Sequence, residues 1–219
     1  MKKPVIVTVD VVLLTVDMES ALDNVLRVGL MKRPNPPCKG VYALPGGYVH
    51  VDEDLDTEAA ARRVLTSKIG VEVPYLEQLA TFSGATRDPR GWSLSVCYIA
   101  LVSPEVMAQW PAVDVARVDH LPTLAFDHAD LIAAAVARVR SKSSYSALPA
   151  FMLPETFTLA ELQEIYERVL GHRLDKSSFR RKLRDLDFVE EVSGQFQGGP
   201  QRPAKLFRLK SMTLFDRTI

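Results

Sequence analysis

The sequence has few cysteines, no excess of either charge and no long apolar run. Only two of its 219 residues are cysteines, Cys38 and Cys97, and their wide separation excludes a disulfide framework and favours a reducing, cytoplasmic compartment. Basic and acidic residues balance at 27 each, which excludes a wholly basic coat for nucleic acid but allows a local basic patch. No apolar run is long enough to cross a bilayer, so we expect no membrane partner.

The sequence also lacks the residue patterns of a metal centre or a nucleophilic catalyst. Its four histidines have no metal-type spacing, and we expect them to be structural or solvated. They are His50, His120, His128 and His172. No Ser/His/Asp or Cys/His arrangement can be argued, so we predict neither catalytic residues nor a resident metal or cofactor.

An apolar content of 47% is enough for a substantial core. The pattern of residue types along the chain changes near residues 145–155. Before that point, runs rich in β-branched residues alternate with turn signals. The expected strands are Val5–Val16, Val25–Arg33, Leu76–Ser83 and Ser93–Val102. The first of these follows the N-terminus, but Asp10 breaks its apolar run, which indicates a strand rather than a signal peptide. Residues 52–70 are expected to form a helix, and a second helix is expected from Asp127 as N-cap to about Ser141.

After the boundary the pattern is two helices followed by a hairpin. Thr158 and Glu161 form a capping box before an apolar stripe that ends at Gly171. A second helix is expected from Lys176 to Leu186, with Asp175 as N-cap, and strand-like stretches follow at 188–194 and 204–210. The connection at 195–203 is rich in glycine and proline. We therefore predict an N-terminal domain over residues 1–145 and a winged helix-turn-helix over residues 152–219.

Two short stretches carry a further signal. "LPGGYV" at 44–49 precedes "RRVLTSKIGV" at 62–71 at about the distance found in the box of Nudix hydrolases, which this region resembles. Thr156–Leu209 is similar, more specifically, to the winged helix of the Nudix-related transcriptional regulators, the NrtR family. The resemblance covers nearly the whole chain. It implies an α+β fold, in which a Nudix-type α/β/α sandwich is followed by the winged helix.

The box lacks the carboxylates that would hold a divalent cation. A Nudix helix needs glutamates at i, i+3 and i+4, which place three carboxylates on one face. Aligned on its arginine and glycine, the helix carries Val64, Ser67 and Lys68 at those positions. Aligned on the preceding glycines, it carries Arg62, Leu65 and Thr66. We therefore predict no diphosphate hydrolysis. The alternative is an active hydrolase with displaced ligands chosen from Glu53, Asp54 and Glu58.

A domain that lacks the metal-binding glutamates can still keep a ligand pocket. Glycines allow a close backbone approach, and cationic side chains can bind phosphates, although each of these charges could equally be solvated. The expected effector-binding residues are Arg33, Gly46, Gly47, Lys68, Arg87 and Arg90. The resemblance implies a nucleotide-like effector, typically ADP-ribose, although sugars serve in some relatives.

The helix at 176–186 and the hairpin after it carry most of the positive charge of the second half. A basic, polar helix face suits the major groove and a basic wing suits phosphates, although an ordinary solvated face has the same pattern. The expected DNA-binding residues are Lys176, Ser177, Arg180, Arg181, Arg184, Gln201, Arg202 and Lys205. The resemblance further implies a homodimeric repressor that binds a palindromic site in double-stranded DNA and controls genes of NAD-related or sugar metabolism.

Overall fold

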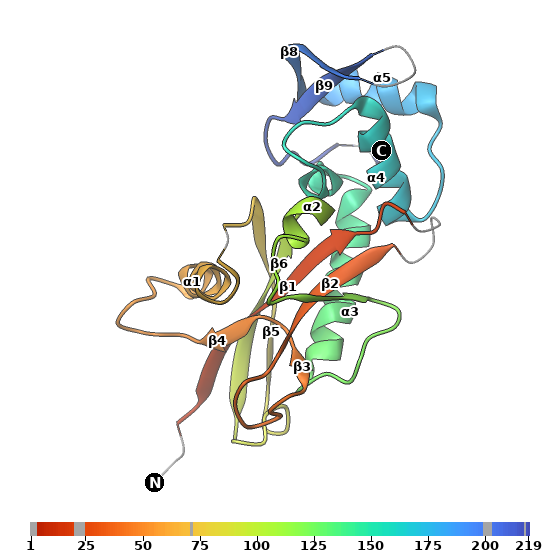
Figure 1. Ribbon diagram of the computed structural model, residues 1–219. Helices are drawn as coiled ribbons and strands as arrows, with labels where there is room; N and C mark the ends of the chain where they lie inside the picture. Colours follow the sequence, from red (N-terminus) through yellow and green to blue (C-terminus); the bar gives the residue numbers. More distant parts are fainter. Residues whose placement is uncertain (1–3, 20–24, 71, 199–202, 217) are drawn as a thin grey trace. The chain divides into compact units, whose positions relative to one another are not determined.

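The computed structural model describes residues 4–19, 25–70, 72–198, 203–216 and 218–219. The chain forms two compact units (Figure 1). The first, the sheet unit, comprises residues 1–15, 26–102 and 106–136. The second, the winged-helix unit, comprises residues 16–25, 103–105 and 137–219.

The sheet unit is built on a mixed seven-stranded sheet in the order β3-β2-β1-β6-β5, in which β4 pairs with β1 and β7 pairs with β2. The predicted strands are present, and β3, β4 and β7 are additional. The seven strands are β1 (Ile6–Val16), β2 (Leu26–Lys32), β3 (Tyr42–Ala43), β4 (Gly46–Tyr48), β5 (Tyr75–Gly84), β6 (Ser93–Leu101) and β7 (Asp114–Arg117). β1 runs parallel to β6 and antiparallel to β4.

β1 lies in the middle of the sheet and is covered on both faces, which explains its nearly continuous apolar sequence. α1 (Thr57–Ile69) lies on one side of the sheet and α3 (His128–Ser143) on the other (Figure 1). On the α1 side, Val11 and Leu13 share a core cluster with Ala61 and Val64. The α/β/α sandwich predicted by the resemblance is therefore present.

Helix α1 starts and stops where its sequence signals indicate. The carboxylate of Asp56 accepts a hydrogen bond from the Ala59 N–H, and Gly70 ends the helix in the left-handed region with φ 82°. Two short elements were not expected, the helix α2 (Pro104–Met107) and the 3₁₀ helix η1 (Leu148–Met152). Both are too short to show a helical period in the sequence.

The winged-helix unit contains α4 (Leu159–Leu170), α5 (Lys176–Leu186), β8 (Val189–Gln197) and β9 (Ala204–Leu209). Both expected caps form: Thr158 and Glu161 make a reciprocal capping box, and Asp175 accepts from the Ser178 N–H. β8 extends three residues beyond the expected strand into the predicted connection, because Phe196 and Gln197 pair with β9 after a bulge. The units divide inside α3, whose residues from 137 onward belong to the winged-helix unit.

Candidate functional site

A pocket of about 650 Å³ lies in the sheet unit. All six residues predicted to bind the effector line it, from the loop after β2, from β4, from α1 and from the loop after β5. These residues are Arg33, Gly46, Gly47, Lys68, Arg87 and Arg90. The structure therefore brings together side chains that lie up to 57 positions apart in the sequence.

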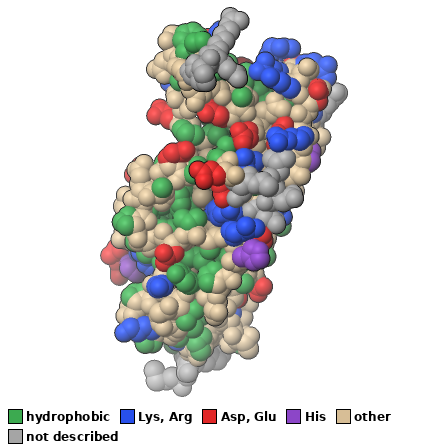
Figure 2. All heavy atoms as spheres, turned by 45° about the vertical axis from the view of Figure 1, so that its right-hand side comes forward, with side chains coloured by type: hydrophobic (Ala, Val, Ile, Leu, Met, Phe, Trp, Pro, Cys, Tyr) green, Lys and Arg blue, Asp and Glu red, His purple; other side chains and the backbone are tan. Residues whose placement is uncertain are grey.

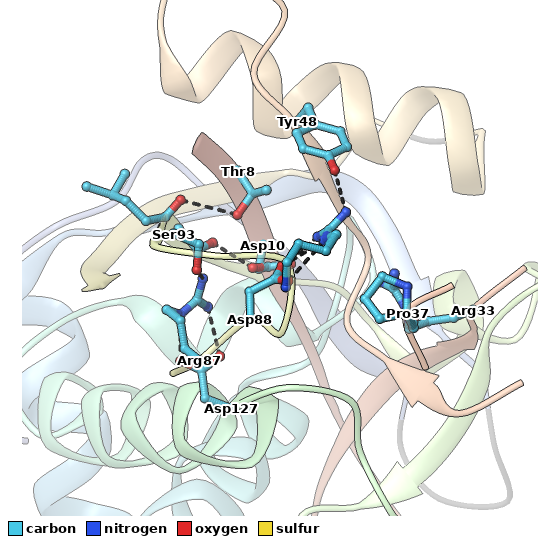
Figure 3. Close-up of polar contacts among 12 residues, drawn as sticks. Thr8, Asp10, Arg33, Pro37, Tyr48, Arg87, Asp88, Ser93 and Asp127 are labelled. Atoms are coloured by element: carbon cyan, nitrogen blue, oxygen red, sulfur yellow. Dashed lines mark hydrogen bonds and ion pairs between the residues drawn. The ribbon is translucent and has the colours of Figure 1, made fainter. Parts of the chain in front are cut away.

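The floor of the pocket is polar and was not predicted. Asp10 of β1 is 7% exposed, and its carboxylate accepts a hydrogen bond from the Ser95 hydroxyl at 2.6 Å (Figure 3). The buried ring of His128 lies beside it, with Nε2 3.6 Å from the carboxylate. Nδ1 of this ring accepts from the Leu44 N–H at 2.9 Å, so Nε2 carries the proton. Burial lowers the pKa of His128, although Asp10 opposes the shift, and a neutral ring results.

Asp10 also explains why residue 46 is a glycine. A Cβ at this position would lie 2.0 Å from Oδ1 of Asp10 and 2.8 Å from the Val9 carbonyl. At Gly47 a Cβ would come no closer than 3.2 Å, to a methyl group of Val64. Of the two glycines, Gly46 is thus the one that the packing requires, and it lets the backbone of β4 lie directly against the carboxylate.

Lys68 is exposed, and its amino group lies against the wall of the pocket. It donates a hydrogen bond to the carbonyl of Gly46 and lies near Asp10 and Arg33. Desolvation lowers the pKa of Lys68, and Asp10 acts in the opposite direction. The side chain therefore places a positive charge against the same backbone segment that forms the pocket wall.

Arg87 is 10% exposed and is held by a bidentate pair with Asp127, at 2.7 and 2.8 Å. It also donates to the Ser93 hydroxyl at 3.3 Å (Figure 3). Asp127 does stand at the start of α3, where its carbonyl accepts from the Asp130 N–H. This is the predicted N-cap position, and both oxygens of the Asp127 carboxylate accept hydrogen bonds from Arg87.

Arg33 and Arg90 lie over aromatic rings that also line the pocket. The guanidinium of Arg33 is 4.6 Å from the ring centre of Phe126, and that of Arg90 is 5.4 Å from Tyr48. Each is also anchored by a polar contact, Arg33 on the Pro37 carbonyl at 2.8 Å and Arg90 on the Asp88 carboxylate at 2.6 Å (Figure 3). The side-chain hydrogen bond from Arg90 lowers the pKa of Asp88, and this carboxylate is ionised at neutral pH.

The helix positions that would hold a metal have other uses. Val64 is 1% exposed and belongs to the core, and the Ser67 hydroxyl donates to the Val64 carbonyl. Three nearby carboxylates are also occupied. Asp54 forms a bidentate pair with Arg63, Glu58 pairs with Arg62 at 2.8 Å, and Asp56 caps α1. Within the part of the chain that the structure describes, no three His, Cys, Asp or Glu residues form a group that could hold a metal ion.

The predicted DNA-binding side chains of α5 share its solvent face. Phe179 and Leu183 are 2% and 4% exposed and turn toward the core of the unit, which leaves the intervening residues outside. The exposed residues are Lys176, Ser177, Arg180, Arg181 and Arg184. Figure 2 shows Lys and Arg side chains gathered over this part of the winged-helix unit. No hydrogen bond or ion pair among the described residues engages the three arginines, which leaves them available to a polyanion.

One of the residues predicted for the wing forms an ion pair. Lys205 is exposed, but its ammonium lies 2.9 Å from the Glu191 carboxylate of the paired strand. Gln201 and Arg202, the other residues predicted for the wing, lie outside the described residues.

The turn between α4 and α5 is organised by a carboxylate that was not predicted. Glu167 is 4% exposed and accepts hydrogen bonds from the Leu174 N–H at 3.0 Å, from Gln163 at 2.8 Å and from Arg173 at 2.6 Å. Burial opposes ionisation, but these hydrogen bonds outweigh it and lower the pKa of Glu167.

Comparisons with known proteins agree with this architecture. The family model for the NrtR DNA-binding winged helix domain matches residues 149–209. The chain is 43% identical, over 90% of its length and 81% of the relative's, to the ADPR responsive transcriptional repressor NtrR of Acinetobacter baylyi.

Two solved structures of Shewanella oneidensis NrtR are also similar. The first is a complex with a 27mer DNA. The match covers 97% of this chain and 99% of the Shewanella chain, with 37% identity and a TM-score of 0.85. In the second, the NUDIX domain is complexed with ADP ribose; it matches 63% of this chain and 90% of its own with 37% identity and a TM-score of 0.52. No helix in the described part of this chain is long and apolar enough to span a membrane.

Proposed function

This chain belongs to the NrtR family of Nudix-related transcriptional regulators, and from that premise we propose that it is an ADP-ribose-responsive repressor. Its winged helix binds double-stranded DNA, and its sheet unit binds the effector without cutting it. The observation that carries this proposal is the pairing, on one chain, of a cationic pocket with an exposed basic helix face; among the described residues, no group of three His, Cys, Asp or Glu could hold a metal ion.

The pocket suits a diphosphate that carries a base and sugars. Its lining includes Lys32, Arg33, Lys68, Arg87 and Arg90 against two carboxylates, Asp10 and Asp88, so its net charge is positive. Arg33 and Arg90 are positioned to donate to phosphate oxygens, and the adjacent aromatic and apolar wall offers a surface for a base. A volume of about 650 Å³ is in the range of cavities that hold a ligand of this size.

Lys68 supplies a fixed charge where hydrolysis would need a metal. An ammonium can neutralise part of a diphosphate's charge, but it cannot lower the pKa of a bound water as a divalent cation does. The carboxylates nearest α1 are tied to Arg62, Arg63 and the helix cap. We therefore infer binding without turnover.

The hydrolase alternative is tested directly by incubating the protein with ADP-ribose and Mg²⁺ and measuring AMP. We expect no release above the rate without protein. Steady release that an Arg90→Ala change abolishes would establish a hydrolase with displaced ligands and end the sensor proposal.

The exposed face of α5 is proposed to enter the major groove. Arg180, Arg181 and Arg184 can reach base edges and phosphates, and Lys176 and Ser177 stand at the helix start, where phosphate contacts are common. Arg202 and Gln201 are proposed wing contacts, and Lys205 would first have to leave Glu191. One winged helix reads few base pairs, so we propose a homodimer on a palindromic operator, acting in the cytoplasm.

The regulatory part is tested by the effect of ADP-ribose on DNA binding. A duplex is first selected from a random pool with the full-length protein, and its Kd is then measured by fluorescence anisotropy with and without saturating ADP-ribose. We expect ADP-ribose to weaken the affinity by about 5–150-fold, the usual range of allosteric coupling. AMP and ribose 5-phosphate, added separately, serve as controls for the two halves of the effector. An unchanged Kd in saturating ADP-ribose would refute the response.

A further inference from the structure

Three consecutive residues of α4 make polar contacts with three different segments of the chain. Tyr166 is fully buried, Glu167 is 4% exposed, and the side chain of Arg168 is 10% exposed. Successive residues of a helix are about 100° apart around its axis, so neighbouring side chains face different directions. All three contacts described next lie within the winged-helix unit.

Tyr166 contacts the segment that follows α3. Its hydroxyl donates to the Ser146 carbonyl at 2.7 Å, and the Ser146 hydroxyl donates to the Lys142 carbonyl in the last turn of α3, at 2.6 Å. The other end of α3 belongs to the pocket, because His128 lines it and Asp127 pairs with Arg87. A single regular helix therefore joins the pocket wall to the partner of Tyr166.

Arg168 contacts the segment that follows β1. Its guanidinium donates to the Asp17 carbonyl at 3.1 Å and to the Met18 carbonyl at 2.6 Å. The same strand contributes Thr8 and Asp10 to the pocket. β1 is hydrogen-bonded along its length to β6, so it is a second regular element that runs from the pocket to α4.

Glu167 connects α4 to α5, the helix proposed to contact DNA. The carboxylate accepts the Leu174 N–H and the guanidinium of Arg173, and Asp175 immediately afterwards caps α5. A shift of α4 is thereby passed to the start of α5. Tyr166 adds a second connection, because its ring packs edge-on against Phe179 of α5 with centroids 5.5 Å apart.

We propose that Tyr166 and Arg168 are positioning residues that transmit the state of the pocket to the DNA-binding surface. Tyr166 contacts the segment that follows α3, and Arg168 contacts the segment that follows β1. Glu167 connects α4, which carries both residues, to α5. This inference rests on the proposed function, because it assumes that the effector occupies the pocket and that the duplex lies on α5.

The test measures coupling rather than stability. For each full-length variant, the Kd of the selected duplex is measured with and without saturating ADP-ribose, and the ratio of the two is the coupling factor. Arg168→Ala and Tyr166→Phe should each lower a wild-type factor of about 5–150, because each breaks one of the two connections, and the double variant should reduce it to below about 2. Binding of ADP-ribose to the DNA-free variants, measured by calorimetry, is expected to stay within about twofold of wild type.

Matched variants separate this role from an ordinary structural one. Arg168 also pairs with Glu164 at i,i+4, at 2.7 Å, and Arg62 forms the same kind of pair with Glu58 at 2.8 Å. Glu164→Gln and Arg62→Ala should therefore keep the wild-type coupling factor. Arg168→Lys, which retains a donor, should recover part of it. Glu167→Gln should lower the coupling factor only in part, because the Tyr166 ring still packs against Phe179 of α5.

Two failures are distinguishable. A wild-type protein with a coupling factor of 1 overturns the proposed function, and the inference falls with it. A coupled wild type whose Arg168→Ala and Tyr166→Phe variants remain fully coupled overturns the inference alone. If Arg168→Ala does not fold, Arg168→Lys and Tyr166→Phe decide by the same measurement, since each keeps most of the side chain.

Discussion

Replacing Gly46 by alanine tests the geometry of the pocket floor. The added Cβ would lie 2.0 Å from Oδ1 of Asp10 and 2.8 Å from the Val9 carbonyl. Neither atom can move away cheaply, because Val9 lies in the central strand and the Asp10 carboxylate is held by Ser95 at 2.6 Å. The substitution must therefore push β4 away from β1 or turn the Asp10 side chain out of its hydrogen bond.

Both adjustments have a known scale. Overpacking costs about 1–3 kcal/mol, and losing a buried hydrogen bond to a charged group costs about 1.5–3 kcal/mol. The free energy of unfolding of the sheet unit should thus fall by about 1–3 kcal/mol, whichever adjustment occurs. At about 2–4 °C per kcal/mol for a chain of this size, its Tm should fall by about 2–12 °C.

The measurement is calorimetric unfolding of the full-length protein, together with titration of ADP-ribose. Gly47→Ala is the matched control, because its Cβ meets only a methyl group of Val64 at 3.2 Å, and we expect it to lose no more than about 1 kcal/mol. The double variant Asp10→Ala with Gly46→Ala should be less unstable than the sum of the single changes, since the closest contact is gone. A Gly46→Ala protein that melts with the wild type and binds ADP-ribose normally would refute the assigned floor.

Three further predictions concern other parts of the molecule. The pKa of Glu167 in the folded protein lies below its usual 4.5, so the contribution of its carboxylate to the free energy of unfolding is complete above pH 4.5 and is lost as the pH falls through the lowered value. In denaturant titrations from pH 7 to pH 3, Glu167→Gln should therefore make the free energy of unfolding less dependent on pH. Arg181→Ala should weaken duplex binding by about 1–3 kcal/mol if it reads a base, or lower the salt slope by about 1 if it touches only phosphate, and an effect on neither would remove it from the interface. Burial, and secondarily Asp10, raise the pKa of the Cys97 thiol, so a thiol reagent at pH 8 should label the partly exposed Cys38 at once and Cys97 only after unfolding.

The local elements were predictable because their signals are local. The capping box of Thr158 and Glu161, and Asp175 before α5, satisfy backbone donors that lie within three residues of each cap. The solvent face of α5 follows from the spacing of Phe179 and Leu183 alone. Such features need no knowledge of the rest of the chain.

Contacts between distant segments were harder to predict from the sequence. The carboxylate of Asp127 could be read only as a cap, because its partner Arg87 lies 40 positions earlier. Asp10 did leave a signal, since a charge inside a strand that is apolar on both faces must find a buried partner, but nothing near it in the sequence identified Ser95 or His128.

The absence of carboxylates at the three metal-binding positions of α1 affects catalysis in the pocket more than it affects ligand binding. Arginines that sit on aromatic rings and an ammonium fixed on the Gly46 carbonyl are present before the ligand arrives, so they stabilise a bound diphosphate in its ground state. Catalysis requires interactions that grow stronger in the transition state, and the Nudix chemistry obtains them from a metal that also delivers the attacking water. With Val64 packed into the core and Lys68 supplying the cation, the proposed sensor keeps the affinity and lacks the nucleophile. A regulator benefits from that combination, because a ligand that is not consumed reports its own concentration.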